Sequence, residues 1–201
     1  MIRTRALGAA LGALLLLMPA AGALAQTPEL VERTPEMEQR AAELTALFPT
    51  ELGGVSLVDD LQVEVGPELL AELDPSDPDD AEQIADIHEI MEAAGATVDD
   101  AATAVTFFAL DEDDFGFVAA YQILGSDAQL TLPLFVAAWQ EDLPESTAEQ
   151  GQIAGKEVTV LRNDDDPDAE ALVLLSSGDT TWMVSVPEQF LEEAVASFPG
   201  A

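Results

Sequence analysis

The sequence predicts an α+β fold, with an antiparallel sheet of about six strands and amphipathic helices packed mainly on one face of it. Apolar, strand-like segments follow one another through short polar turns, so hairpins outnumber βαβ units. Four or five further segments repeat apolar residues at helical spacing. The chain of 201 residues contains no cysteine, so its apolar core has to carry the stability of the fold.

The first 25 residues have the features of a cleaved signal peptide. Arg3 and Arg5 form a short positive region, and an apolar segment, residues 7–18, follows it. Ala23 and Ala25 supply the small residues at the −3 and −1 positions of a signal peptidase site. The apolar segment is shorter than the roughly 20 residues of a membrane span. We therefore expect cleavage after Ala25, export to the periplasm or the exterior, and no membrane span in the processed chain.

Cleavage there would leave 176 of the 201 residues, which is enough for one domain with a substantial core. Residues 26–34 are expected to form a flexible leader. Residues 35–201 are expected to form a single α+β domain, since no change in composition marks a boundary between two domains.

The processed chain is extremely acidic. All 40 Asp and Glu residues follow residue 28, and the first two arginines leave with the signal peptide. Four bases against 40 acids give the processed chain a net charge of −36; these bases are Arg33, Arg40, Lys156 and Arg162. Such a surface repels phosphate backbones and anionic lipids, so we expect no binding to nucleic acid. Salt or divalent cations would relieve the self-repulsion, and halophilic adaptation is one interpretation of the composition.

Two helices with clear end signals are expected in the first half of the domain. Thr34 can cap a helix that has Pro35 at its first position and ends at Phe48. The second runs from an Asp77 cap to a stop at Gly95. Its buried stripe is expected to contain Ile84, Ile87 and Met91.

A strand and a short helix are expected between these two helices. Leu61, Val63 and Val65 alternate with polar residues, which is typical of a half-buried strand. Val55 and Leu57 are interpreted as its partner strand. Residues 67–73 are expected to form the short helix.

The second half is expected to consist mainly of hairpins. Residues 104–110 and 115–125 are apolar and flank an acidic turn, and residues 170–177 and 180–186 join through a Ser-Gly-Asp turn. Residues 152–163 form one strand, or two short strands around Ala154 and Gly155. Residues 126–142 are expected to form a helix that Pro133 kinks or restarts. Pro187 opens a final helix with an apolar face, made of Phe190, Leu191, Ala194, Val195 and Phe198.

Two acidic clusters are candidate calcium sites. The first consists of Asp164, Asp166 and Asp168, but the EF-hand pattern fails there because Ala169 and Leu175 stand where glycine and glutamate are needed. The second consists of Asp111, Asp113 and Asp114. Irregular acidic loops also bind calcium, often weakly. Solvated hairpin tips have the same composition, so both interpretations stay open.

Catalytic motifs are sparse. His88 is the only histidine, and we expect it to have a structural or surface role at the edge of the buried stripe, with Glu92 one turn further on. The chain has no G-x-S-x-G motif, and one histidine without cysteine cannot build a histidine-rich zinc site. Paired carboxylates could perform acid–base chemistry, which only their geometry can decide.

These observations favour an exported, highly acidic, non-enzymatic binding or accessory domain that uses no cofactor. Its partner would be a protein or a small molecule that the sequence does not identify. One alternative is a Ca²⁺-responsive extracellular module that uses its acidic hairpin loops. The other is a carboxylate-dependent hydrolase.

Overall fold

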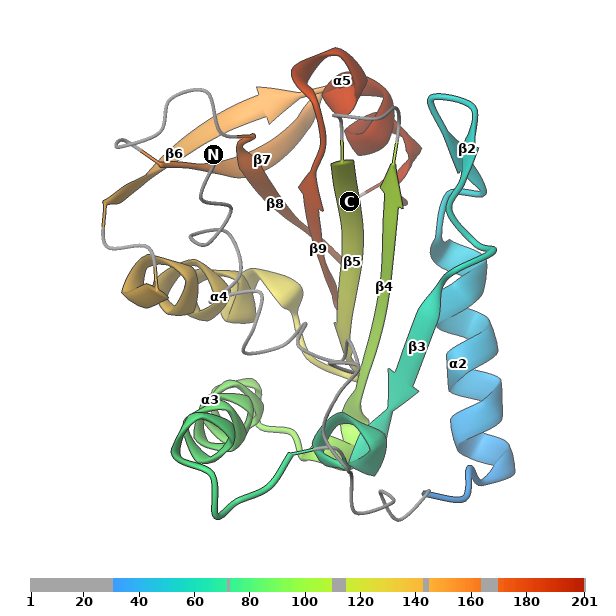
Figure 1. The fold of residues 1–201 in the computed structure, drawn as a ribbon, viewed down its shortest axis with the longest axis vertical. Helices are drawn as coiled ribbons and strands as arrows, with labels where there is room; N and C mark the ends of the chain where they lie inside the picture. The colour runs from blue at the N-terminus through green and yellow to red at the C-terminus, as the bar shows by residue number, and fades with distance from the viewer. Residues whose placement is uncertain (1–30, 72, 110–114, 143–144, 164–169, 201) are drawn as a thin grey trace, which may run out of the picture.

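A computed structural model describes residues 31–71, 73–109, 115–142, 145–163 and 170–200 (Figure 1). Seven strands form one antiparallel sheet in the order β3-β4-β5-β9-β8-β7-β6, and β1 (Glu51–Leu52) pairs with β2 (Val55–Ser56) in a separate hairpin. The strands of the large sheet are β3 (Gln62–Val65), β4 (Ala101–Ala109), β5 (Phe115–Ile123), β6 (Ser146–Ile153), β7 (Lys156–Asn163), β8 (Leu172–Ser177) and β9 (Thr180–Ser185). The α+β class is therefore confirmed, with seven strands in the sheet where about six were expected.

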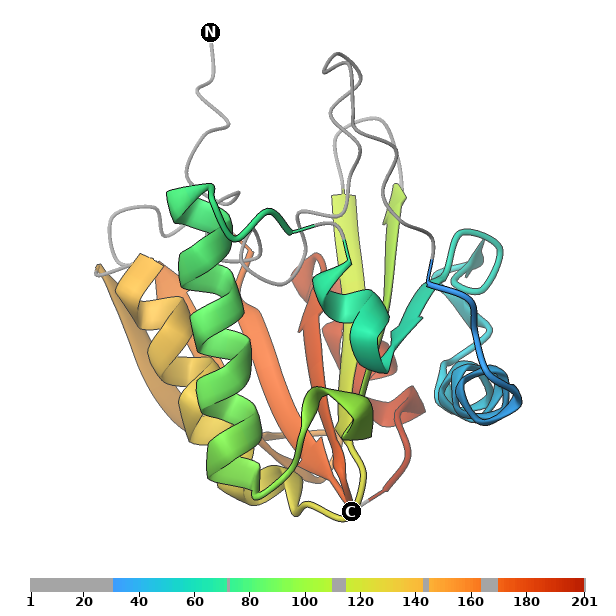
Figure 2. The same cartoon turned by 90° about the horizontal axis from the view of Figure 1, so that it is seen from below.

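Helices cover both faces of this sheet, so the prediction that they pack mainly on one face is wrong (Figure 2). Leu44 and Val195, from two of the helices, share one buried cluster, whereas Ile87 and Phe135 belong to a second. The helices of the first cluster are α2 (Pro35–Leu47) and α5 (Glu188–Ser197), and those of the second are α3 (Pro78–Ala94) and α4 (Ala128–Asp142). Two short 3₁₀ helices, η1 (Gly66–Leu70) and η2 (Val98–Asp100), flank α3 in the chain.

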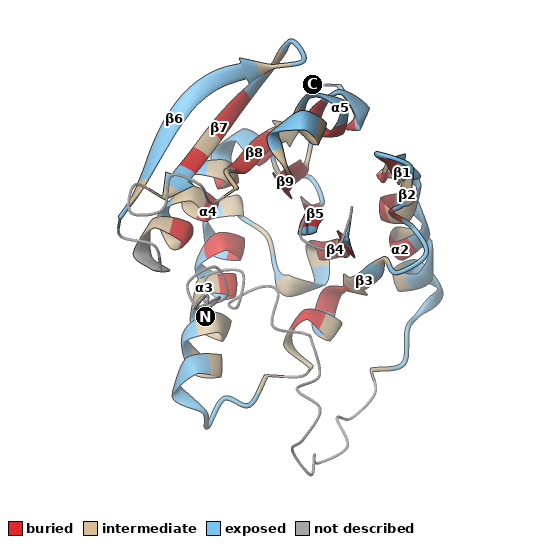
Figure 3. Cartoon of the chain, turned by 45° about the horizontal axis from the view of Figure 1, so that its top comes forward, coloured by how far each residue is buried: buried red, intermediate tan, exposed pale blue. Residues whose placement is uncertain are grey.

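The central strands explain why both faces need a cover. In β5, Val118 and Ala120 enter the first cluster, while the alternating residues Ala119 and Tyr121 enter the second. A strand that is apolar on both sides has to be covered on both sides, because either face left open would expose apolar area to water. Figure 3 shows the contrast with the outer strand β6, which is exposed along most of its length.

The helix boundaries follow the end signals in the sequence. The Thr34 hydroxyl accepts a hydrogen bond from the Met37 amide at the start of α2. The Asp77 carboxylate accepts one from the Asp79 amide at 2.9 Å, at the start of α3. Gly95 ends α3 at φ 68°, in the left-handed region that favours glycine. Among the described residues, no helix has both the length and the apolar character needed to cross a bilayer.

Strand pairing differs from the prediction at two places. β2, which contains Val55, pairs with β1, so it is not the partner of β3 as expected. The partner of β3 is β4, with Val63 opposite Ala104. Residues 146–163 form two long strands, β6 and β7, that meet at a two-residue turn in which Ala154 and Gly155 have φ of 51° and 78°. β6 has no large apolar residue except Ile153 next to the turn, whereas β7 has Val158, Val160 and Leu161 in its middle. The sequence therefore indicated β7 better than β6.

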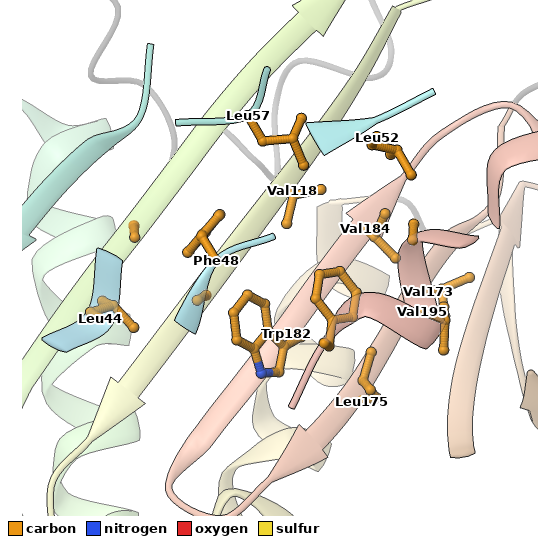
Figure 4. Packing of buried hydrophobic residues seen from close by; sticks show 14 of the residues in the cluster. Leu44, Phe48, Leu52, Leu57, Val118, Val173, Leu175, Trp182, Val184 and Val195 are labelled. Carbon is orange, nitrogen blue, oxygen red and sulfur yellow. The ribbon is translucent and has the colours of Figure 1, made fainter. Parts of the chain in front are cut away.

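Trp182 lies at the centre of the first cluster (Figure 4). Its side chain is fully buried, and its ring stacks on Phe198 at a centroid distance of 4.6 Å. The Phe48 ring contacts it from the end of α2 at 5.2 Å. These contacts join α2 and α5 to strand β9, so the aromatic group ties one helical layer to the middle of the sheet.

Leu44→Ala tests whether this cluster carries the stability of the fold. Leu44 is fully buried in the cluster, so the substitution should lower the free energy of unfolding by about 2–5 kcal/mol, measured by urea denaturation. Leu130→Ala is the matched control because Leu130 also lies on a helix but is 66% exposed. It should change the free energy by less than about 0.5 kcal/mol. Equal losses in the two variants would contradict the assignment of the core.

Candidate functional site

Asp164, Asp166 and Asp168 lie outside the described residues, and so do Asp111, Asp113 and Asp114. Within the described part of the chain, no group of three or more His, Asp or Glu side chains is placed to hold a metal ion. The candidate sites below are therefore built from other residues.

An open groove lies where α3 ends, between η1 and η2. Its volume is about 620 Å³. His88, Met91 and Glu92 contribute from α3, and the remaining lining residues are Pro67, Leu70, Ala96, Thr97, Val98 and Asp99. His88 is exposed, in keeping with the surface role expected for it, and it shares the groove with two acidic residues. The sequence could not indicate this groove, because its lining comes from three elements that only the fold brings together.

Arg40 fixes one wall of the groove from α2. Its guanidinium donates to the carbonyl oxygens of Asp99 and Asp100, at 2.5 Å and 2.7 Å. Desolvation by burial lowers the pKa of Arg40, and the surrounding carboxylates only partly offset that effect. The Asp100 carboxylate in turn accepts hydrogen bonds from the amide and the hydroxyl of Thr97, which lower the pKa of Asp100. The η2 turn is thus held by donors on both sides.

Arg33 holds the opposite wall. It forms an ion pair of 2.7 Å with Glu68 in η1 and also donates to the carbonyl oxygen of Val63. Glu68 accepts a further hydrogen bond from the Val65 amide at 2.9 Å. Gly66 lies at φ 61°, close to the backbone of Asp99, so η1 and η2 contact each other there.

The groove can offer both polar and apolar contacts to a ligand. The imidazole of His88 can donate or accept a hydrogen bond, and the carboxylates of Glu92 and Asp99 accept. Pro67, Leu70 and Met91 supply apolar surface. A second hollow, between α3 and the sheet, measures about 20 Å³ and is lined mainly by core side chains such as Tyr121 and Phe135. That volume is close to the space of one water molecule, so this hollow is a packing defect without room for a ligand.

The outer surface of α4 is the second candidate site. Residues 128–140 carry no charged side chain, although the chain has 40 acids. Ala128, Thr131, Phe135 and Trp139 point into the second cluster or its edge and are buried. Leu130, Pro133 and Ala137 lie on the opposite side, and Leu134 lies on the flank of the helix, where part of its side chain packs against the second cluster. We name these four apolar residues, at i, i+3, i+4 and i+7, the α4 face. Leu130 is 66% exposed, Pro133 and Ala137 are exposed, and Leu134 is half-buried.

The α4 face differs from the other long uncharged stretches of the described chain in being exposed. The two other long uncharged stretches that are described, residues 101–109 and 115–126, form β4 and β5 in the sheet and the turn that follows β5. In α4, by contrast, the uncharged stretch of residues 128–140 has an exposed side. The sequence predicted a helix for this segment but did not indicate that its outer side is a site. The signal that could have found it is the absence of charge in a highly acidic chain.

No family model, curated protein or solved structure matches this chain.

Arg40→Met tests whether the position of a base, and not only its charge, stabilises the fold. Two carbonyl oxygens would lose their donor, so the free energy of unfolding should fall by about 1–3 kcal/mol in urea denaturation. Arg162→Met removes the same charge from an exposed position on β7 and should cost less than about 0.5 kcal/mol. Similar losses in both variants would show that only the number of bases matters.

Proposed function

We propose that the protein is an exported, non-enzymatic binding domain that holds its partner on the α4 face. Export is inferred from the predicted signal peptide, with cleavage after Ala25. The observation that carries the binding proposal is the uncharged apolar strip from Leu130 to Ala137, on a chain that contains 40 acids.

The grouping of these residues on one helix favours a binding role. A single exposed leucine is normal on a protein surface and needs no explanation. Three exposed apolar residues on one side of a helix, with half-buried Leu134 on their flank, form a continuous strip within a stretch that carries no charge. Such a strip is stabilised when a partner removes it from water, by about 25 cal/mol for each Å² of apolar area buried. Exposed apolar patches of this kind mark interaction surfaces.

Site-specific photocrosslinking tests the proposal. A photoreactive amino acid replaces Leu130 in the full chain, expressed in cells of the organism that makes the protein. Illumination should give one discrete adduct, identified by mass spectrometry, because position 130 would lie against the partner. An excess of the processed wild-type chain should abolish the adduct. An excess of the Ala137→Glu variant should not, since its α4 face carries a charge.

The control places the same amino acid at Gln39, an exposed position on α2 on the other side of the sheet. It should give no such adduct. The proposal would be wrong if positions 130 and 39 gave the same pattern, or if the Ala137→Glu chain competed as well as the wild type.

A further inference from the structure

We infer that the partner of the α4 face is a cationic amphipathic helix. This inference rests on the proposed function and adds the chemical class of the partner to it. Two properties of the surface lead to it: the spacing of the apolar residues on α4 and the charge of the neighbouring helix α3.

Helix α3 is the acidic neighbour of α4. It carries six acids and neither lysine nor arginine: Asp79, Asp80, Glu82, Asp86, Glu89 and Glu92. Glu82 and Glu89 are exposed. The two helices pack against each other, and both bury their inner sides in the cluster on the same face of the sheet (Figures 1 and 2). Their outer sides therefore turn toward the same side of the molecule.

The α4 face has the spacing that another helix can match. Residues at i, i+3, i+4 and i+7 form a ridge that spans about 10 Å along the axis, at 1.5 Å per residue. A partner helix with apolar residues at the same spacing packs such a ridge into its own groove. Basic residues along the flank of that partner would lie near the carboxylates of α3. An apolar strip beside an acidic helix thus complements a helix that is apolar on one side and cationic beside it.

The charge argues against two other occupants. A second copy of the chain would bring another net charge of −36 and another acidic α3 to the same surface. An anionic membrane surface would likewise be repelled by these carboxylates. A cationic helix gains from the same charges, because they accelerate its association and strengthen it at low salt.

A pair of synthetic peptides tests the inference on the processed chain. The first is a helix of 14 leucine and lysine residues with all the leucines on one side. The second has the same composition with the leucines spread around the helix. Fluorescence anisotropy at about 0.15 M NaCl should show at least tenfold tighter binding of the first peptide, because only that peptide can cover the α4 face.

Variants of the chain separate apolar contact from general attraction. Ala137→Glu adds an acid, so it would strengthen a purely electrostatic attraction; we expect at least tenfold weaker binding instead. Glu82→Gln with Glu89→Gln should weaken binding severalfold and flatten its salt dependence. Glu38→Gln with Glu192→Gln makes the same charge change at exposed positions on α2 and α5, on the other face, and should have little effect.

Three results would overturn the inference: equal binding of the two peptides, equal weakening by the two glutamate pairs, or no binding of either peptide. The inference would also be overturned if the chain dimerised or bound anionic vesicles and the Ala137→Glu substitution abolished that behaviour. Such a result would identify a second copy or a membrane as the occupant of the α4 face. If the photocrosslinked adduct at position 130 persists in any of these cases, the α4 face still binds a partner, and only the class of partner is wrong. If the adduct is absent as well, the proposed function fails with it.

Discussion

Self-repulsion among the carboxylates is the constraint on which the rest of this structure depends. If the signal peptide is removed, four bases remain against 40 acids, so neutralisation by ion pairs cannot be general. Three of the four bases instead donate to backbone carbonyl oxygens: Arg33 to Val63, Arg40 to Asp99 and Asp100, and Lys156 to Ala196 and Phe198. Arg33, which also pairs with Glu68, links η1 to the start of α2, while Arg40 and Lys156 bind carbonyl oxygens at the ends of η2 and α5. A positive charge complements the carbonyl end of a helix. The few bases therefore stabilise contacts between helices and the rest of the fold. The apolar core has to offset the repulsion between the carboxylates.

That core is effective because the sheet is apolar on both sides. Trp182 and Val184 of β9 face the cluster under α2 and α5, while Met183 between them faces the cluster under α3 and α4. Each central strand thus contributes to two clusters, and the helices form a layer on each side. In the described part of the chain, most acids lie on the outer sides of the helices and in exposed turns, where water and salt screen them. The α4 face departs from this arrangement, and this departure supports a role in binding.

The sequence predicted the parts of the fold that depend on local signals. Thr34, Asp77 and Gly95 marked helix ends correctly, and the β4–β5 and β8–β9 hairpins were expected from apolar runs around polar turns. It failed where the outcome depends on tertiary packing. A strand that is apolar throughout does not indicate which helix covers which face of the sheet. Strand β6 was hard to predict because both of its sides are exposed, so its sequence has no alternating pattern. The same holds for the sites, since the groove at His88 needs three elements to meet and the exposure of Leu130 depends on which side of α4 packs inward.

The most direct test of this account is the free energy of unfolding of the processed chain as a function of NaCl, from about 0.1 to 1 M, where the screening length falls from about 10 to 3 Å. If repulsion between carboxylates opposes the core, the free energy should rise steadily with salt. CaCl₂ and MgCl₂ at the same ionic strength should raise the free energy of unfolding by the same amount as each other. Both should reach a given increase at a lower concentration than NaCl. A free energy that does not change with NaCl would contradict the account, and a large gain with calcium alone would replace general screening with a specific calcium site.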